Sequence, residues 1–312
     1  VTELAIELGP LRGRVVSAGP GRVVQSSGGS RRGEWRLWGV PDGLPSAYVL
    51  SLLQDRRGHM WFVTLRGGIC RYDGDRFTVF GSQQGLPDPS VQAILEDSRG
   101  DLWFGTGWRD SGGGGLCRFD GQRFEIFDVD NGLPDNSVQC LLEDRAGHLW
   151  LGTYEGGVSR FDGRQFTTFT VEDGLADNSI WAIHEDSRGD LWFGTGGWGS
   201  TASVGGVTHY DGTRFTSFPI GNTAGRHRVW AIHEDESGNL WFGTRDAGVY
   251  RFDRQRQTFE PFDVDSGLAG NKVWAIAETQ DGDMWFATRG GVSRYDGSRW
   301  TSYTTEDGLP HS

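Results

Sequence analysis

The sequence predicts an all-β fold, a β-propeller of four-stranded antiparallel blades, and three observations lead to it. A tryptophan in strings similar to "LWFGT" recurs with spacings of 42, 47, 42, 49 and 44 residues, at Trp61, Trp103, Trp150, Trp192, Trp241 and Trp285. Units of about 40 to 45 residues are typical of propeller blades. Glycine accounts for 50 of 312 residues and aromatic residues for 12%, which suits many short strands joined by turns.

Each unit contains four segments of strand length. The template runs through "SVQAILED", an almost continuous apolar run, then "DLWFGT" after a glycine turn, "GGVSRFD" after a glycine pair and "QFTTFT" after Asp-Gly. Because the connections are short, neighbouring strands pair in an antiparallel meander. Apolar residues on both faces of each sheet indicate blades that stack radially.

One main domain, residues 33–312, is therefore expected. Its six complete blades are residues 43–84, 85–131, 132–173, 174–225, 226–266 and 267–307. The fifth unit departs most from the template, since it opens at "RHRVWAI" without Gly-Leu-Pro and has "DRQRQ" where the others have Asp-Gly.

The two ends of the sequence predict a partial seventh blade. Residues 33–42, "GEWRLWGVPD", align with the fourth strand of a unit, and residues 308–312, "GLPHS", repeat the start of one. Propellers commonly complete one blade from both termini, which removes free edges. We therefore expect a fragment of a seven-bladed ring, with a six-bladed ring and an extra outer strand as the weaker alternative. Residues 1–32, rich in Gly, Ser and Arg, are expected to be a linker or poorly ordered.

A repeated aspartate has a structural explanation. It precedes a turn glycine by three residues, so its carboxylate can accept turn N–H groups while glycine supplies the positive φ. The residues are Asp55, Asp97, Asp144, Asp186 and Asp235, and Asp281 breaks the register. The pattern resembles the Asp-box of sialidase propellers, which is structural there too and implies no glycosidase activity.

The full repeat resembles a known family. "GLP-x-x-x-V-x-x-I-x-E-D-x-x-G-x-L-W-x-G-T-x-x-G-G-V-x-R-[FY]-D-G-x-x-F" over residues 34–312 is similar to the two-component regulator propeller repeat of hybrid histidine kinase sensor ectodomains. The resemblance implies a periplasmic or otherwise extracytoplasmic sensing propeller, followed in the parent protein by a β-sandwich, a membrane span and a kinase. The sequence itself shows no apolar run long enough for a membrane span.

Charge and cysteine content narrow the partners. The formal net charge of −12 argues against nucleic acid, which needs a basic stripe. Cys70 and Cys117 are equivalent positions of adjacent blades, about 10 Å apart and beyond disulfide reach, so with Cys140 we expect reduced core thiols. His184 and His233 share a first-strand position and are expected to approach each other as packed histidines rather than metal ligands. We expect no cofactor, no metal site and no catalytic residues.

Loop insertions indicate a binding face. The long insertions, residues 107–114 and 196–206, both join second to third strands, and insertions confined to one face commonly mark the binding face. The candidate ligand-binding residues there are Arg66, Trp108, Arg109, Tyr154, Trp198, Arg245 and Arg289. Aromatic planes with guanidinium groups suit a sugar or an anionic oligosaccharide. Trp181, Trp230 and Trp274 recur in first strands, where we expect inter-blade packing.

Two classes of function follow. The first is a non-enzymatic sensor module that binds a small molecule or oligosaccharide and acts through downstream signalling domains of the same polypeptide, with a dimer of the parent protein left open. The second is an enzyme, because streptogramin-lyase-like propellers have a similar repeat. A protein-interaction platform is a further alternative.

Overall fold

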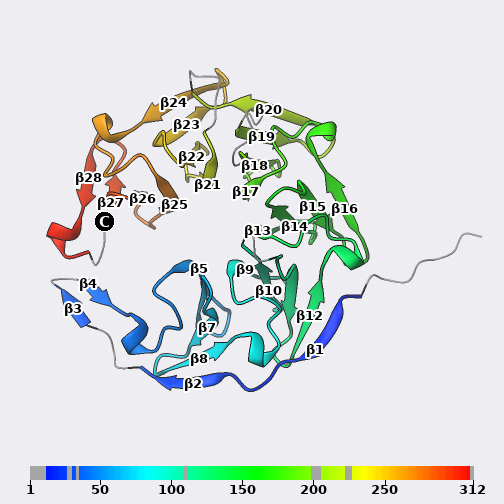
Figure 1. Cartoon of the computed structure of the whole chain (residues 1–312). Coiled ribbons are helices and arrows are strands. Elements are labelled where there is room, and N and C mark those ends of the chain that lie inside the picture. Colours follow the sequence, from blue (N-terminus) through cyan, green and yellow to red (C-terminus); the bar gives the residue numbers. More distant parts are fainter. Residues whose placement is uncertain are drawn as a thin grey trace, which may run out of the picture.

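The structure is a computed structural model that describes residues 12–26, 30–32, 35–108, 112–197, 205–221 and 227–309. Six antiparallel sheets, each built on four consecutive strands, stand in a ring with the first of these strands innermost (Figure 1). The predicted β-propeller is therefore confirmed.

Each blade is a meander of four consecutive strands, and the predicted strand segments are confirmed. Blades one to three are β5–β8 (Val49–Gln54, Met60–Thr64, Gly68–Tyr72, Arg76–Phe80), β9–β12 (Val91–Glu96, Leu102–Thr106, Leu116–Phe119, Arg123–Phe127) and β13–β16 (Val138–Glu143, Leu149–Thr153, Val158–Phe161, Phe166–Phe169). Blades four to six are β17–β20 (Ile180–Glu185, Leu191–Thr195, Gly206–Tyr210, Phe215–Pro219), β21–β24 (Val229–Glu234, Leu240–Thr244, Val249–Asp253, Thr258–Phe262) and β25–β28 (Val273–Glu278, Met284–Thr288, Gly291–Tyr295, Trp300–Tyr303).

Short 3-10 turns connect most blades. In the described residues they are Val40–Asp42, Ser82–Gln84, Val129–Asn131, Val171–Asp173, Val264–Ser266 and Thr305–Asp307. The glycine of each Gly-Leu pair closes the turn in the left-handed region, as Gly132 does at φ 100°, and the next leucine, such as Leu133, is buried. The connection that leads into the fifth blade lacks this pair, and residues 222–226 there lie outside the described part.

The repeated aspartates form the predicted turns and make one further contact. In blade two, Asp97 Oδ1 accepts the N–H groups of Arg99 and Asp101, and its Oδ2 accepts the indole N–H of Trp103 at 2.8 Å. Blades one, three, four and five repeat this bond to the tryptophan six residues on. In blade six Thr279 takes the aspartate position, which confirms the broken register at Asp281. The sequence analysis did not predict the indole bond, although the constant spacing of six residues between aspartate and tryptophan could have indicated it.

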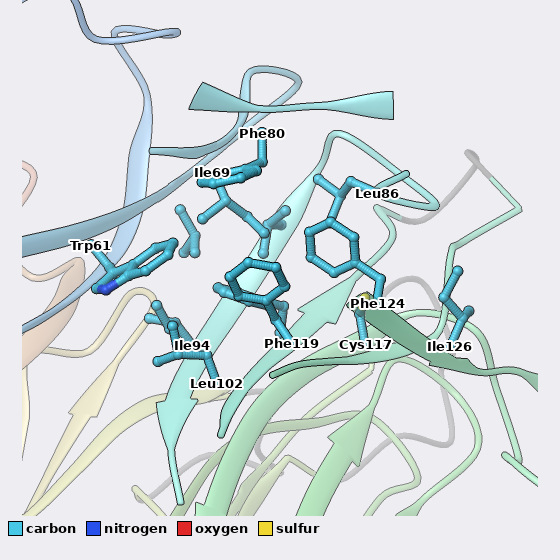
Figure 2. Close-up of a cluster of buried hydrophobic side chains, with 13 residues drawn as sticks. Trp61, Ile69, Phe80, Leu86, Ile94, Leu102, Cys117, Phe119, Phe124 and Ile126 are labelled. Atoms are coloured by element: carbon cyan, nitrogen blue, oxygen red, sulfur yellow. The ribbon is translucent and has the colours of Figure 1, made fainter. Parts of the chain in front are cut away.

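These tryptophans join each blade to the next. Trp61 of blade one lies 6.2 Å from Phe104 of blade two, measured between ring centroids. Trp150, Trp192 and Trp241 repeat this contact, whereas Trp103 meets Phe161, because blade three has Leu151 in place of the second-strand phenylalanine. Figure 2 shows the first boundary, where Trp61 and Phe80 meet Phe119 and Phe124. Cys70 and Cys117 are buried in these cores and Cys140 is half-buried, and all three are free thiols as predicted.

Glutamates also join each blade to the one before it. The last residue of an inner strand accepts the backbone N–H that follows the turn aspartate of the preceding blade, as Glu96 does from Arg56 at 2.9 Å. Glu143, Glu185, Glu234 and Glu278 repeat this bond. Blade one has Gln54 in this place.

In the described part of the chain, the ring is open between blades six and one. Inner strands of consecutive blades contact one another from β5 to β25, whereas Figure 1 shows a gap between β28 and β4. Leu52 on blade one is 60% exposed, and Phe62 is half-buried where the equivalent residues of the other blades are fully buried. A two-stranded sheet, β3 (Ser30–Arg32) with β4 (Trp35–Leu37), lies at this position. The predicted strand in residues 33–42 therefore spans Trp35–Leu37, and a seventh blade in this place stays a prediction.

The amino-terminal segment differs from the expected linker. β1 (Arg14–Ser17) pairs with β12 and β2 (Arg22–Gln25) pairs with β8, so each adds a fifth, outermost strand to a blade (Figure 1). The short "RVV" run in each of these strands pairs with a blade edge. The backbone groups of that edge would otherwise face solvent. Residues 1–11 and 27–29 lie outside the described part, as do residues 310–312 of the predicted seventh unit.

Candidate functional site

The second-to-third strand loops and the starts of the inner strands lie on one face of the ring, as predicted. The residue after each second strand donates its N–H to the carbonyl of the residue before the inner strand of the same blade. Tyr154 donates to Ser137, its own blade's entry residue, at 3.0 Å, and Arg245 to Arg228 and Arg289 to Lys272 at 2.9 Å within their blades. We call this side the loop face.

Each of these bonds lies within a single blade and not between neighbouring blades, because the first and second strands of a blade pair directly. Tyr154 and Ser137 belong to blade three, and Arg289 and Lys272 to blade six. The bonds place the first loop residue beside the entry of its own inner strand.

The structure places five of the seven predicted loop residues. Tyr154, Arg245 and Arg289 occupy the same position, directly after the second strand of blades three, five and six. Arg66 lies one residue later in blade one, exposed and at φ 63°, and Trp108 is half-buried beyond β10. Arg109 and Trp198 lie outside the described residues.

Only some of these residues come together. Arg245 and Arg289 both act electrostatically on Lys272, and Tyr154 meets Trp181 edge to face with ring centroids 6.0 Å apart. A hollow of about 610 Å³ lies beside Tyr154 and is lined also by Gly112, Pro134 and Asp135.

The first-strand tryptophans form a row across blades four to six. Trp181 and Trp230 have ring centroids 6.3 Å apart, and Trp230 and Trp274 stack at 4.5 Å with an interplanar angle of 17°. They contact one another across blade boundaries, as expected for packing residues. Trp274 is nevertheless 54% exposed, so a large aromatic surface remains open to solvent.

Lys272 is the functional candidate that sequence reasoning missed. It is the one lysine in the sequence, and its ammonium lies 6.0 Å from the Trp230 ring centroid and 5.6 Å from that of Trp274. Burial lowers its pKa, and the guanidinium groups of Arg289 and Arg245 lower the pKa further, while Asp246 acts in the opposite direction. In the sequence, its position two residues before Trp274 could have indicated this contact.

The two first-strand histidines do approach each other, at the other end of the inner strands. The His184 and His233 ring centroids are 6.4 Å apart, and His233 Nε2 lies 3.6 Å from Glu278 Oε2. Burial, then the proximity of His233, lowers the pKa of His184. Within the described ranges no group of three His, Cys, Asp or Glu side chains is arranged to hold a metal ion.

The fold and the loop face together define a β-propeller with a candidate binding surface of aromatic and cationic side chains. The sequence pattern described as "Two component regulator propeller" matches residues 43–66, 85–108, 132–155, 174–197, 225–246 and 267–290. The chain belongs to this family of propeller repeats.

Solved structures of similar fold come from several kinds of protein. The extracellular domain of a protein assigned as a hybrid two-component system from B. thetaiotaomicron is 22% identical, with a TM-score of 0.70 over 96% of this chain and 40% of the other. Virginiamycin B lyase from Staphylococcus aureus is 16% identical, with a TM-score of 0.64 over 84% and 85%. PorZ of Porphyromonas gingivalis, a component of the type-IX secretion system, is 18% identical, with a TM-score of 0.66 over 88% and 44%.

These likenesses show the fold, and the chain spans well under half the length of the first of them. Comparison with curated protein sequences found no match. Among the described residues, no helix has the length and apolar character needed to cross a membrane.

Proposed function

We propose that the chain is the extracytoplasmic sensing propeller of a two-component regulator, and that it recognises a sugar or an anionic small molecule on its loop face. The observation that supports the proposal is a combination: six two-component regulator propeller repeats, and exposed aromatic and cationic side chains gathered on one face. Aromatic planes bind sugar rings or flat ligands, and guanidinium groups bind carboxylates.

Binding at this face suits signalling because several blades contribute to it. A ligand that contacts blades three, five and six favours one arrangement of those blades over another, and its differential affinity shifts the equilibrium between the two. The shift would be passed to downstream signalling domains of the same polypeptide, which in this family's hybrid regulators would include a histidine kinase.

A ligand screen with site mapping tests the proposal. The chain is screened by thermal shift against neutral sugars, acidic sugars and small organic anions, and hydrogen exchange then locates the protected backbone. We expect a stabilising ligand that protects the loop-face residues 153–157 and 244–248 and is recovered chemically unchanged. Protection confined to the opposite face would contradict the proposal, and recovery of a cleaved ligand would favour an enzyme such as a lyase.

A further inference from the structure

The most distinctive feature of the loop face is a cation above a tryptophan stack. Trp230 and Trp274 stack at 4.5 Å, and Lys272 lies within 6.0 Å of both ring centroids. Packing explains the contact between the two indoles, and the open side of the ring beside blade six explains why Trp274 is exposed, but neither explains the ammonium beside the stack. An exposed aromatic plane next to a cation can hold a ring that carries a negative charge.

Positive charge is concentrated at this place although the whole chain is acidic. Arg289 and Arg245 both act electrostatically on Lys272, whereas the net charge of the sequence is −12. Asp246 is the acidic group that acts on Lys272, and its carboxylate is already 2.9 Å from His227 Nδ1. Like charges held together destabilise one another, so an anion bound between them would be favoured.

In two other blades, glutamine amides occupy the inner-strand position that holds these tryptophans. The second residue of the inner strand is tryptophan in blades four to six and glutamine in blades two and three, at Gln92 and Gln139. The Nε2 atoms of both glutamines are buried and have no hydrogen-bond acceptor among the described residues. Buried amide donors normally have a partner, and hydroxyl oxygens are suitable ones.

We propose that the Trp230–Trp274 stack and Lys272 form a subsite for a carboxylated sugar, that is, a uronate. The sugar ring lies against Trp274, and its carboxylate faces Lys272 and Arg289. Its hydroxyl oxygens are acceptors of the kind that glutamine amides bind. This inference rests on the proposed function and narrows it, because a neutral sugar has no carboxylate to pair with Lys272 and Arg289.

Isothermal titration with a matched pair of ligands tests it. Digalacturonate and its methyl ester share the same rings and differ in charge. We expect digalacturonate to bind at least about tenfold more tightly than the ester, the size of one charge-assisted hydrogen bond, and the difference to shrink at high salt. Lys272→Met should remove this difference, and Trp274→Ala should weaken both ligands.

The control variant is Arg256→Ala, which changes an 81% exposed cation in the blade-five turn that has "DRQRQ" in place of Asp-Gly. It should bind digalacturonate as the unchanged chain does, and unfolding curves show whether each variant is folded. Equal binding of acid and ester, or full affinity in Lys272→Met, would overturn the uronate subsite. So would an affinity for digalacturonate weaker than about 10 mM. The proposed function would then still be decided by the wider screen, in which another ligand can protect the loop face.

Discussion

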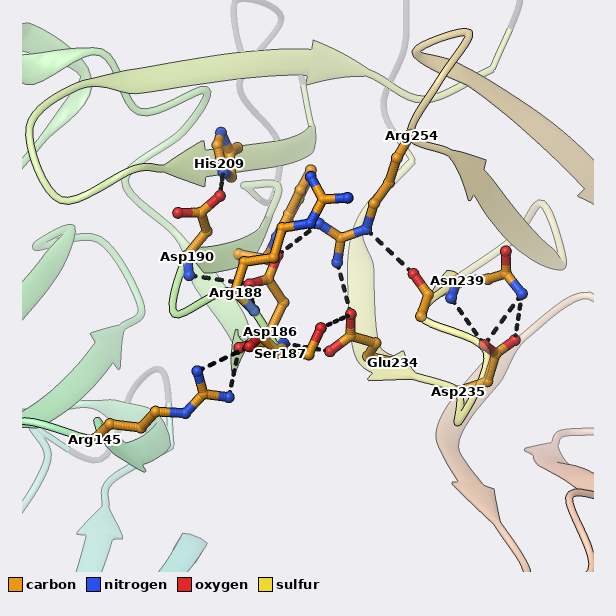
Figure 3. Close-up of polar contacts among 12 residues, drawn as sticks. Arg145, Asp186, Ser187, Arg188, Asp190, His209, Glu234, Asp235, Asn239 and Arg254 are labelled. Carbon is orange, nitrogen blue, oxygen red and sulfur yellow. Dashed lines mark hydrogen bonds and ion pairs between the residues drawn. The ribbon is translucent and has the colours of Figure 1, made fainter.

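The guanidinium of Arg254 lies 2.8 Å from the carboxylate of Asp186, measured from Nη1 to Oδ2, across the boundary between blades four and five (Figure 3). The same guanidinium bonds Glu234 at 2.8 Å and lies 5.9 Å from the Trp192 ring centroid. In blades one to three a third-strand arginine of the same blade covers the equivalent tryptophan, at 5.9, 5.8 and 5.9 Å. Blade four has His209 in that place, so blade five supplies the missing cation.

Removal of this arginine should destabilise the ring. The Asp186 carboxylate is fully buried, and Arg254→Met would leave it without its cation, at a cost of about 3 kcal/mol in the free energy of unfolding. Urea denaturation measures the change. Arg256→Met is the matched control, because its side chain is 81% exposed, and it should change stability by less than about 0.5 kcal/mol. Equal effects of the two variants would contradict the buried ion pair.

A second substitution should restore part of the loss. In blade two Arg118 both covers Trp103 and pairs with Asp101, and His209 pairs with the equivalent Asp190 at 2.8 Å. His209→Arg in an Arg254→Gly background therefore recreates the arrangement of blade two. We expect it to recover at least about 1 kcal/mol relative to Arg254→Gly alone. No recovery would mean that blade four cannot accommodate its own arginine.

The same comparison of blades shows what sequence alone can predict. Strand positions were predictable because apolar runs and turn glycines are local, and the repeat register placed Tyr154, Arg245 and Arg289 in one loop position. The pairing of Arg14 with Ile126 was not predictable, since it joins segments far apart in the chain through backbone groups. The Lys272 subsite was missed for a related reason: its partner Trp230 belongs to another blade.

Blade six offers a gain-of-stability test of the turn. Trp285 Nε1 is buried with no acceptor in the described part of the chain, because Thr279 stands where the other blades have aspartate. Thr279→Asp should accept this indole N–H and stabilise the fold by about 1 kcal/mol in urea denaturation. Blades two and four already hold aspartates at both equivalent turn positions, so the nearby Asp283 should not prevent it. Thr279→Val, without a carboxylate, is the control, and a Thr279→Asp protein less stable than the unchanged chain would contradict the expectation.

The open side of blade one can be tested with a pair of equivalent residues. Leu52 is 60% exposed, whereas Ile94 at the same strand position of blade two is buried against its neighbour. Ile94→Ala should therefore cost about 2–4 kcal/mol, and Leu52→Ala less than about 0.5 kcal/mol. Thermal and urea unfolding measure both. A Leu52→Ala cost close to that of Ile94→Ala would show that another segment covers this face.

The buried histidine of blade four should make stability depend on pH. His184 Nε2 is buried without a hydrogen-bond partner in the described residues, and burial, with His233 beside it, holds the pKa of His184 below its ordinary value of 6.5. The unfolded chain therefore takes up the proton first as pH falls. The contribution of neutral His184 is fully present above about pH 6.5 and is lost as pH falls through the lowered folded pKa, by up to about 1.4 kcal/mol per pH unit.

His184→Leu is the variant that isolates this effect, because leucine occupies the equivalent position in blades one to three, at Leu53, Leu95 and Leu142. Urea midpoints measured between pH 7.5 and 5 should fall less steeply for the variant than for the unchanged chain, and the two curves should run parallel above pH 6.5, where neither state of His184 takes up a proton. His59→Gln is the control, because it changes a histidine that already has Asp55 as an ion-pair partner. It should leave unchanged the part of the pH dependence of the urea midpoint that His184 contributes. Parallel curves for His184→Leu and the unchanged chain across the whole range would show that His184 is not the titrating group.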